Sequence, residues 1–328
     1  MCAYVNSHTL MPYSTVVKVL TWSWLTLGFQ SAFSTPNWGF WAHKRINQAA
    51  VLRLPVEMQP FFKKHRDYLV ENAVNPDRRR YAVEGEAPRH YIDLDSYTDS
   101  VRSQLPLYWK DAIQRFGEDS LMKHGIVPWY VQTALSQLTE AFRQRDTRRI
   151  LRLAADLGHY IADANVPLHT TRNHNGQLTN QLRIHAFWQS RIPELYGEDY
   201  DLWIGPARYV YSPAERIWEA VWKAHSAVDT AFRVERTLSA EFGEEKKYSY
   251  ETRNNLLVRT YSREFSARYH AATNYMVERQ FRASVALVGD FWFTAWVNAG
   301  QPDLNALTAR MLTDKEEKEE ADEKRSWL

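Results

Sequence analysis

The sequence predicts an all-α protein, and three observations favour that class. Apolar residues recur at helical spacing, strand-like alternation is scarce, and no repeat with a period of about 20–50 residues is visible. Hydrophobic residues make up 45% of the 328 residues and aromatic residues 14%, which is enough for a sizeable core with large side chains between helices. We therefore expect one multi-helix domain over residues 38–304.

Two helices are expected in the middle of the chain. The first is predicted by apolar residues at intervals of three to four positions: Val131, Leu135, Leu138 and Phe142. Asp146 can cap the second, because its carboxylate can accept a hydrogen bond from an N–H group of the first turn. That helix runs through His159, and Pro167 ends or bends it.

Two long helices rich in Tyr, Phe and Trp are expected further on, over residues 250–278 and 280–297. Gly300 and Pro302 would end the second, because glycine favours the position after a helix and proline cannot continue one. A run of charged residues at 314–325 predicts a solvated, mobile tail. We assign residues 305–328 to this tail and expect no chemistry there.

The N-terminus has the pattern of a secretory signal peptide. Residues 1–34 carry one charge, Lys18, followed by an apolar run and by the small-x-small sequence that ends at Ser34. The only cysteine, Cys2, lies in this segment, so the mature chain would have neither disulfides nor thiolate ligands. We expect a protein that is secreted or lies in a bacterial-type periplasm or cell envelope. The net charge of +2 is too small to predict a nucleic-acid or membrane partner by itself.

The segment from Leu157 to His169 has the spacing of a metal centre. His159 and Asp163 share one face of the predicted helix, and His169 follows Pro167, where it is free to turn back. Such spacing also occurs by chance, because a lone histidine on an apolar helix is usually a core residue. Further candidates stand in unusual contexts beside aromatic residues or proline: His43, Asp77, His90 and His185. Imidazole and carboxylate ligands without thiolates are typical of catalytic zinc sites that stay open to water and substrate.

In motif order, these segments resemble the superfamily that joins bacterial zinc-dependent phospholipase C with the fungal and plant single-strand-specific zinc nucleases. The resemblance covers roughly residues 38–193: a Trp with His five positions later, an Asp, a His, then His-x3-Asp-x5-His and a further His. It implies an all-α domain with a metal cleft that holds three zinc ions. In that family a hydroxide held between two of the ions attacks the phosphorus atom.

The resemblance also implies which residues share each ion. Trp38 would bind one zinc through its amino nitrogen and carbonyl oxygen, together with His43. Asp163 would bridge this ion to the next, so that Asp163 and Asp77 belong to the catalytic pair. The remaining ligands would be Asp77, His90 and His159 for the second ion and His169 and His185 for the third.

Two departures from the family pattern bear on these expectations. The family has a carboxylate four residues after the last His, whereas this chain has Gln189, whose amide oxygen is a poorer zinc ligand. The third ion is therefore expected to be weakly bound, differently ligated or absent. Cleavage after Ser34 would also leave three residues before Trp38, and its nitrogen would then be an amide unless cleavage falls after Asn37.

Three residues near the ligands are candidates for supporting roles. Arg80, within the run of arginines at 78–80, could bind a substrate phosphate, although this run could also be a solvated turn. Tyr91 could stack on a base. Asp156 lies one turn before His159 and could accept a hydrogen bond from its ring.

The leading hypothesis is a zinc-dependent hydrolase of phosphoester bonds, a nuclease or nucleotidase with single-stranded nucleic acid or nucleotides as substrate. One alternative is a zinc-dependent phospholipase C that acts on phospholipid headgroups. Another is a catalytically weakened, metal-binding envelope protein, which Gln189 motivates. No stable protein partner can be inferred from the sequence.

Overall fold

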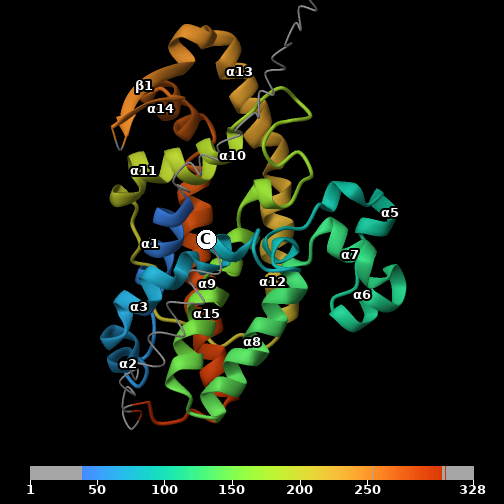
Figure 1. Ribbon diagram of the computed structural model, residues 1–328, viewed down its shortest axis with the longest axis vertical. Coiled ribbons are helices and arrows are strands. Elements are labelled where there is room, and N and C mark those ends of the chain that lie inside the picture. The colour runs from blue at the N-terminus through green and yellow to red at the C-terminus, as the bar shows by residue number, and fades with distance from the viewer. Residues whose placement is uncertain (1–38, 254, 305–306, 308–328) are drawn as a thin grey trace, which may run out of the picture. The chain divides into compact units, whose positions relative to one another are not determined.

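The computed structural model describes residues 39–253, 255–304 and 307. They belong to the second of two units into which the chain divides, Met1–Thr35 and Pro36–Leu328. The expected signal peptide, Trp38 and the charged tail apart from Leu307 lie outside the described residues. The described part is mostly helical with a small two-stranded sheet, in line with the all-α expectation (Figure 1). None of its helices is both long and apolar enough to cross a membrane.

Short helices and turns make up the first part of the domain, before two long helices. The elements are α1 (Gly39–Val51), α2 (Gln59–Lys64), α3 (Arg66–Glu71), η1 (Asn72–Val74), α4 (Asn75–Arg79), η2 (Ala87–His90), η3 (Leu94–Ser96), α5 (Asp99–Arg102), α6 (Trp109–Phe116), α7 (Glu118–His124), α8 (Val127–Arg143) and α9 (Thr147–Ala164).

The second part contains the sheet and three more long helices. Its elements are η4 (Pro167–His169), α10 (Ile184–Ala186), the π-helical turn η5 (Phe187–Arg191), α11 (Ile192–Tyr196), η6 (Gly197–Asp199), α12 (Pro213–Ser226), α13 (Val228–Lys247), β1 (Tyr248–Arg253), β2 (Leu256–Tyr261), α14 (Arg263–Ala272) and α15 (Met276–Asn298).

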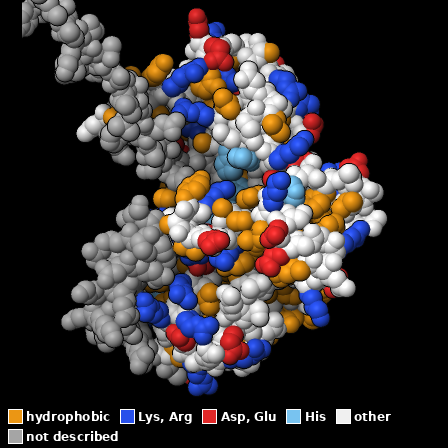
Figure 2. Space-filling view, turned by 45° about the vertical axis from the view of Figure 1, so that its right-hand side comes forward, with side chains coloured by type: hydrophobic (Ala, Val, Ile, Leu, Met, Phe, Trp, Pro, Cys, Tyr) orange, Lys and Arg blue, Asp and Glu red, His pale blue; other side chains and the backbone are white. Residues whose placement is uncertain are grey.

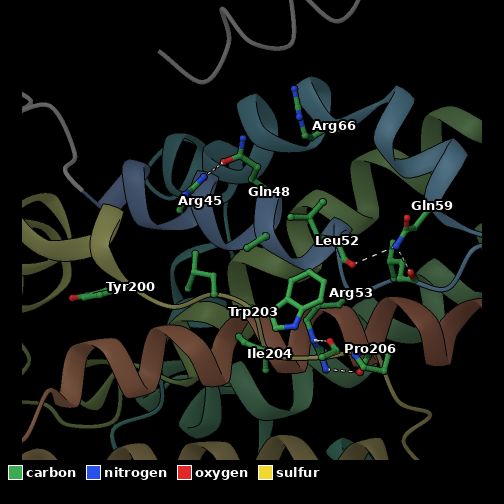
Figure 3. A pocket seen from close by; sticks show the side chains of 14 residues that line it. Arg45, Gln48, Leu52, Arg53, Gln59, Arg66, Tyr200, Trp203, Ile204 and Pro206 are labelled. Atoms are coloured by element: carbon green, nitrogen blue, oxygen red, sulfur yellow. Dashed lines mark hydrogen bonds between the residues drawn. The ribbon is translucent and has the colours of Figure 1, made fainter.

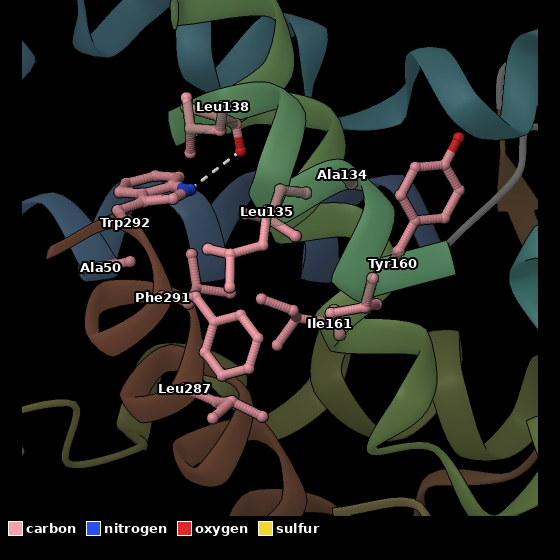
Figure 4. Close-up of a cluster of buried hydrophobic side chains, with 14 of the residues drawn as sticks. Ala50, Ala134, Leu135, Leu138, Tyr160, Ile161, Leu287, Phe291 and Trp292 are labelled. Carbon is pink, nitrogen blue, oxygen red and sulfur yellow. Dashed lines mark hydrogen bonds between the residues drawn. The ribbon is translucent and has the colours of Figure 1, made fainter. Parts of the chain in front are cut away.

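The main core lies among α1, α8, α9 and α15 (Figures 1 and 4). The four apolar residues that predict α8 are all buried there, as are Ile161 of α9 and Phe291 of α15. A hydrogen bond also joins α15 to α9, because the indole Nε1 of Trp292 donates to the carbonyl of Ala154 at 3.0 Å. Two of these helices carry candidate ligands, since His43 lies on α1 and His159 on α9.

A close approach of α1 to α9 depends on a glycine. Asn47 of α1 is fully buried and donates to the carbonyls of Leu69 and Ala155, at 3.3 and 3.2 Å. Gly158 of α9 faces it, and a Cβ atom at Gly158 would lie only 2.0 Å from Asn47 Oδ1. The missing side chain therefore lets the two helices come together beside His159.

The predicted boundaries of α9 are confirmed. Asp146 is its N-cap, and its carboxylate accepts a hydrogen bond from the backbone N–H of Arg149 at 3.0 Å. The helix ends at Ala164, and Pro167 begins the 3-10 turn η4, which ends at His169. The chain thus turns directly after Asp163 and returns His169 toward the helix.

The prediction of one long helix over residues 250–278 is wrong. The chain forms the antiparallel hairpin β1–β2 there, followed by α14 and the first turn of α15. Tyr and Thr occur in both strands and Val258 in β2, and these residues favour extended backbone. Asn255 lies in the turn with a φ of 62°, a left-handed conformation that asparagine tolerates better than most residues. The predicted helix over 280–297 is confirmed within α15.

Buried ion pairs tie this hairpin to the segments around the last predicted ligands. Glu235 of α13 is fully buried, lies 2.8 Å from Lys247 Nζ, and accepts a hydrogen bond from Gln181 in the loop before α10. Arg191 at the end of η5 donates two hydrogen bonds, one from each terminal guanidinium nitrogen, to the two carboxylate oxygens of Glu251 in β1. The hairpin therefore supports the turn that carries Gln189, and α13 supports the loop that leads to His185.

Candidate metal centre

The structure brings together every predicted ligand that it describes. Trp38 lies outside the described residues, and the others come from seven different elements. They are His43 on α1, Asp77 on α4, His90 at the end of η2, His159 and Asp163 on α9, His169 at the end of η4, His185 on α10 and Gln189 in η5. Most of these side chains are buried, so the cluster sits inside the domain.

The first group of ligand atoms surrounds one side of Asp163. Its Oδ2 lies 2.9 Å from His90 Nδ1 and 3.2 Å from His159 Nε2, and these two nitrogens are 3.1 Å apart. Asp77 Oδ1 completes the group at 3.8 and 3.7 Å from the same two nitrogens. Neighbouring ligands of a tetrahedral zinc ion are about 3.3 Å apart, because each bond is about 2.0–2.1 Å long. These four atoms could therefore hold one metal ion.

The other oxygen of Asp163 faces a second set of side chains. Asp163 Oδ1 lies 3.4 Å from His43 Nε2 and 3.5 Å from His169 Nε2. The His43 ring stacks on that of His159 with their centroids 3.9 Å apart. His43, His159 and Asp163 also form a buried group whose ligand atoms could hold a metal ion. One carboxylate thus faces histidines on both sides, as a bridging ligand would.

A third group forms around Gln189. Its Oε1 lies 2.7 Å from His185 Nε2 and 3.3 Å from His169 Nε2. Its amide nitrogen points the other way, 3.4 Å from Asp163 Oδ1 and 3.3 Å from His43 Nε2. Gln189 therefore occupies the place that the resemblance assigns to a carboxylate, and it links the third group to the first two.

The second ring nitrogen of three histidines bonds a backbone carbonyl. Nδ1 of His159 lies 2.9 Å from the carbonyl of Ala73, and Nδ1 of His169 lies 2.6 Å from that of His90. Nδ1 of His185 lies 3.3 Å from the carbonyl of His174. Since only a protonated nitrogen can donate to a carbonyl, each ring in its neutral form would present its Nε2 lone pair to the cluster.

Burial and charge set the protonation of these side chains. Burial lowers the pKa of His43 to about 4 and that of His169 to about 3, so both rings are neutral near pH 7, as metal ligands must be. Burial acts the same way on His159, but the charges of Asp163 and Asp77 outweigh it and raise its pKa to about 9. Without a cation, a proton on His159 would therefore offset the two carboxylates.

The structure corrects the role predicted for Asp156. Its carboxylate lies 2.9 Å from Arg79 Nη2, while the backbone carbonyl of Ala73 takes the hydrogen bond from His159. Arg79 also lies 3.0 Å from Glu86 Oε1 and 2.7 Å from the Tyr160 hydroxyl. The sequence analysis does not predict this buried network. The one available signal is that Glu86 lies four residues before His90, a spacing at which two side chains can meet on one helical turn.

Arg80 and Tyr91 lie at the edge of the cluster. Burial is the main cause of the lowered pKa of His169 and of His185, and the charge of Arg80 lowers both a little further. Arg80 forms no ion pair with another described residue, and Tyr91 is half-buried. Figure 2 shows histidine side chains that reach the surface in a hollow, with Lys and Arg side chains close by. His185 is partly exposed, so the third group is the part of the cluster nearest to solvent.

Another hollow, with a volume of about 560 Å³, lies away from the predicted ligands (Figure 3). It lies between α1 and the segment 200–206, with Trp203 and Leu52 on its wall, and none of the predicted site residues lines it. A much smaller cavity of about 30 Å³ borders His43 and Gln189. Of these two spaces, only the small cavity beside His43 and Gln189 borders predicted ligands.

Comparison with known proteins adds no assignment. No protein-family model matches the chain, and no curated protein matches it.

Proposed function

We propose that this protein is a zinc-dependent hydrolase of phosphoester bonds, with single-stranded nucleic acid or nucleotides as its substrates. The observation that carries the proposal is Asp163, a buried carboxylate with histidine nitrogens close to both of its oxygens. A single carboxylate shared in this way is what a pair of neighbouring metal ions needs. The resemblance supports the zinc nuclease and phospholipase C type of fold for the helical domain.

The donor set suits zinc. Among the described ligand atoms imidazole nitrogens outnumber carboxylates and none is a thiolate, whereas magnesium and calcium prefer all-oxygen sites. Asp77, His90, His159 and Asp163 would hold one ion, and His43 with Asp163 a second. His169, His185 and Gln189 would hold a third, with a neutral oxygen in place of a carboxylate. Zinc in such a site lowers the pKa of water toward neutrality and offsets the charge that develops on a phosphoryl group.

Charge around the cluster supports a phosphate substrate. Burial lowers the pKa of His169 and of His185, which disfavours their charged forms, and Arg80 has no ion-pair partner among the described residues. Its guanidinium would bind phosphate oxygens through two parallel hydrogen bonds, which lysine cannot reproduce. Tyr91, next to His90, would offer a ring to a base or to another flat group.

A substrate panel with and without a chelator tests this function. We expect purified mature protein to hydrolyse single-stranded DNA or RNA, or nucleotides, to lose the activity in excess EDTA, and to regain it with added zinc. Phosphatidylcholine and double-stranded DNA serve as comparison substrates in the same assay. Hydrolysis of phosphatidylcholine alone would favour the phospholipase alternative, and chelator-resistant hydrolysis would contradict the proposal.

Gln189 favours the weakened metal-binding protein as a second candidate, and Gln189→Glu separates the two. With zinc present, we expect the carboxylate to strengthen the third site at least about tenfold, or about 1.4 kcal/mol, and to raise activity. Without zinc, the new charge would face Asp163 Oδ1 across about 3.4 Å and lower the stability. The thermal shift on adding zinc should therefore be larger than for the natural chain.

Gln114→Glu is the matched control, because it makes the same change on an exposed position of α6. It should leave the zinc affinity and the thermal shift unchanged. A Gln189→Glu protein that binds zinc no better than this control would mean that Gln189 is not a ligand.

A further inference from the structure

His90 differs from His159, His169 and His185 in the surroundings of its second nitrogen, because none of the backbone carbonyls that pair with those rings is matched at His90 in the described part of the chain. Its Nδ1 faces Asp163 and His159, and its ring is fully buried. Its Nε2 is also buried and has no hydrogen-bond partner among the described residues. The Glu86 carboxylate is nearby, with Oε1 at 3.7 Å from His90 Nε2. Within the part of the chain that the structure describes, no backbone carbonyl takes the role that Ala73 plays for His159.

Glu86 is held firmly in a place where a charge is costly. It is fully buried, directly before η2, and its Oε1 accepts a hydrogen bond from Tyr160 and lies 3.0 Å from Arg79 Nε. Its Oε2 lies 2.7 Å from Arg89 Nη1. A buried carboxylate needs such partners to stay ionised. They fix Oε1 on the side of the His90 ring away from the cluster.

A histidine that binds a metal through Nδ1 must carry its proton on Nε2. That proton needs an acceptor, and a carboxylate in this position orients the ring and makes the ligand nitrogen more basic. A shift of about 0.8 Å would shorten the 3.7 Å separation to the usual hydrogen-bond length of about 2.9 Å. A small side-chain movement would therefore be enough to form a hydrogen bond between His90 Nε2 and Glu86 Oε1.

We propose that Glu86 is a positioning residue of the metal centre, which accepts a hydrogen bond from His90 Nε2 and so fixes the tautomer that presents Nδ1 to zinc. Arg79 and Tyr160 hold Glu86 in turn, so the network couples α4 and α9 to one ligand. The proposal rests on the zinc centre of the proposed function and adds to it a residue that touches neither metal nor substrate.

Glu86→Gln tests this inference through metal affinity. The amide keeps the shape of the side chain but loses the charge, and Asp156 still pairs with Arg79. We expect the affinity for zinc, measured by competition with a chromophoric chelator, to fall about 10–100-fold. The visible absorption bands of the cobalt-substituted protein should shift as well, because the ligand field of His90 changes. If Glu86→Gln protein is not obtained folded, Tyr160→Phe should weaken zinc binding in the same direction by less.

Asp156→Asn is the matched control. It removes the charge of another buried carboxylate that pairs with Arg79, and this carboxylate does not contact His90. It should leave zinc affinity and the cobalt spectrum close to those of the natural chain. Equal weakening in Glu86→Gln and Asp156→Asn would overturn the proposal, since a loss of network stability would then explain both. Unchanged affinity in Glu86→Gln would overturn it too. A natural chain that binds no zinc would instead refute the proposed function, on which this inference rests.

Discussion

Asp163→Asn is expected to eliminate phosphoester hydrolysis and to lower the bound zinc by more than one ion per chain. Asp163 is the carboxylate that all three groups of ligand atoms approach, with His90 and His159 near one oxygen and His43 and His169 near the other. An amide has the same shape but would present an N–H group to one of these sides. Substitutions beside a metal ligand cost about 10–100-fold in affinity or activity, and loss of this shared ligand should exceed that.

Metal analysis of dialysed protein and turnover of a single-stranded substrate measure this effect together. The comparison variant is again Asp156→Asn, because it lies on the same helix, is buried, and faces Arg79 instead of the cluster. It should keep its zinc. Asp163→Asn protein with a full zinc content would show that the metal lies elsewhere.

Gly158→Ala should have the largest effect on the free energy of unfolding. The added Cβ would lie 2.0 Å from Asn47 Oδ1, and neither α1 nor the fully buried Asn47 can move away without losing its hydrogen bonds to Leu69 and Ala155. Overpacking of this kind costs about 1–3 kcal/mol and sometimes more. Pushing α1 from α9 would also separate His43 from His159, so zinc binding should weaken as well.

Chemical denaturation of the apo protein measures this loss, and Gly39→Ala is its control. A Cβ at Gly39 in α1 would have its nearest neighbours at 3.7 Å, an ordinary contact, so alanine there should be neutral or slightly stabilising. In a double-mutant cycle, adding Asn47→Ala to Gly158→Ala should cost less than the sum of the single changes. Strict additivity would mean that the two side chains do not clash.

Local spacing predicted part of the site well. His159 and Asp163 are four residues apart on one helix, and the cap at Asp146 and the turn at Pro167 determine where that helix begins and ends. These features depend on neighbouring residues only, so the sequence contains them directly. The long-range partners His43, Asp77 and His185 could be grouped with them only through a resemblance, because no local rule states which loops meet in space.

The misses have a physical cause as well. The segment of β1 and β2 is rich in aromatic residues, which suit a buried helix and a strand alike, and the turn at Asn255 was the signal that separates the two. Spacing along the helix predicts a pair of Asp156 with His159, but Arg79 from α4 pairs with Asp156 and the carbonyl of Ala73 pairs with His159. Such competition between partners becomes visible only when the elements are packed together.

The zinc content of the mature protein tests the central claim most directly. Elemental analysis of protein purified without chelators, supplied with zinc and then dialysed should find two to three zinc ions per chain, two held around Asp163 and a weaker third beside Gln189. A content well below one ion per chain would contradict the account, because the buried histidines and carboxylates would then be a polar core and not a metal centre.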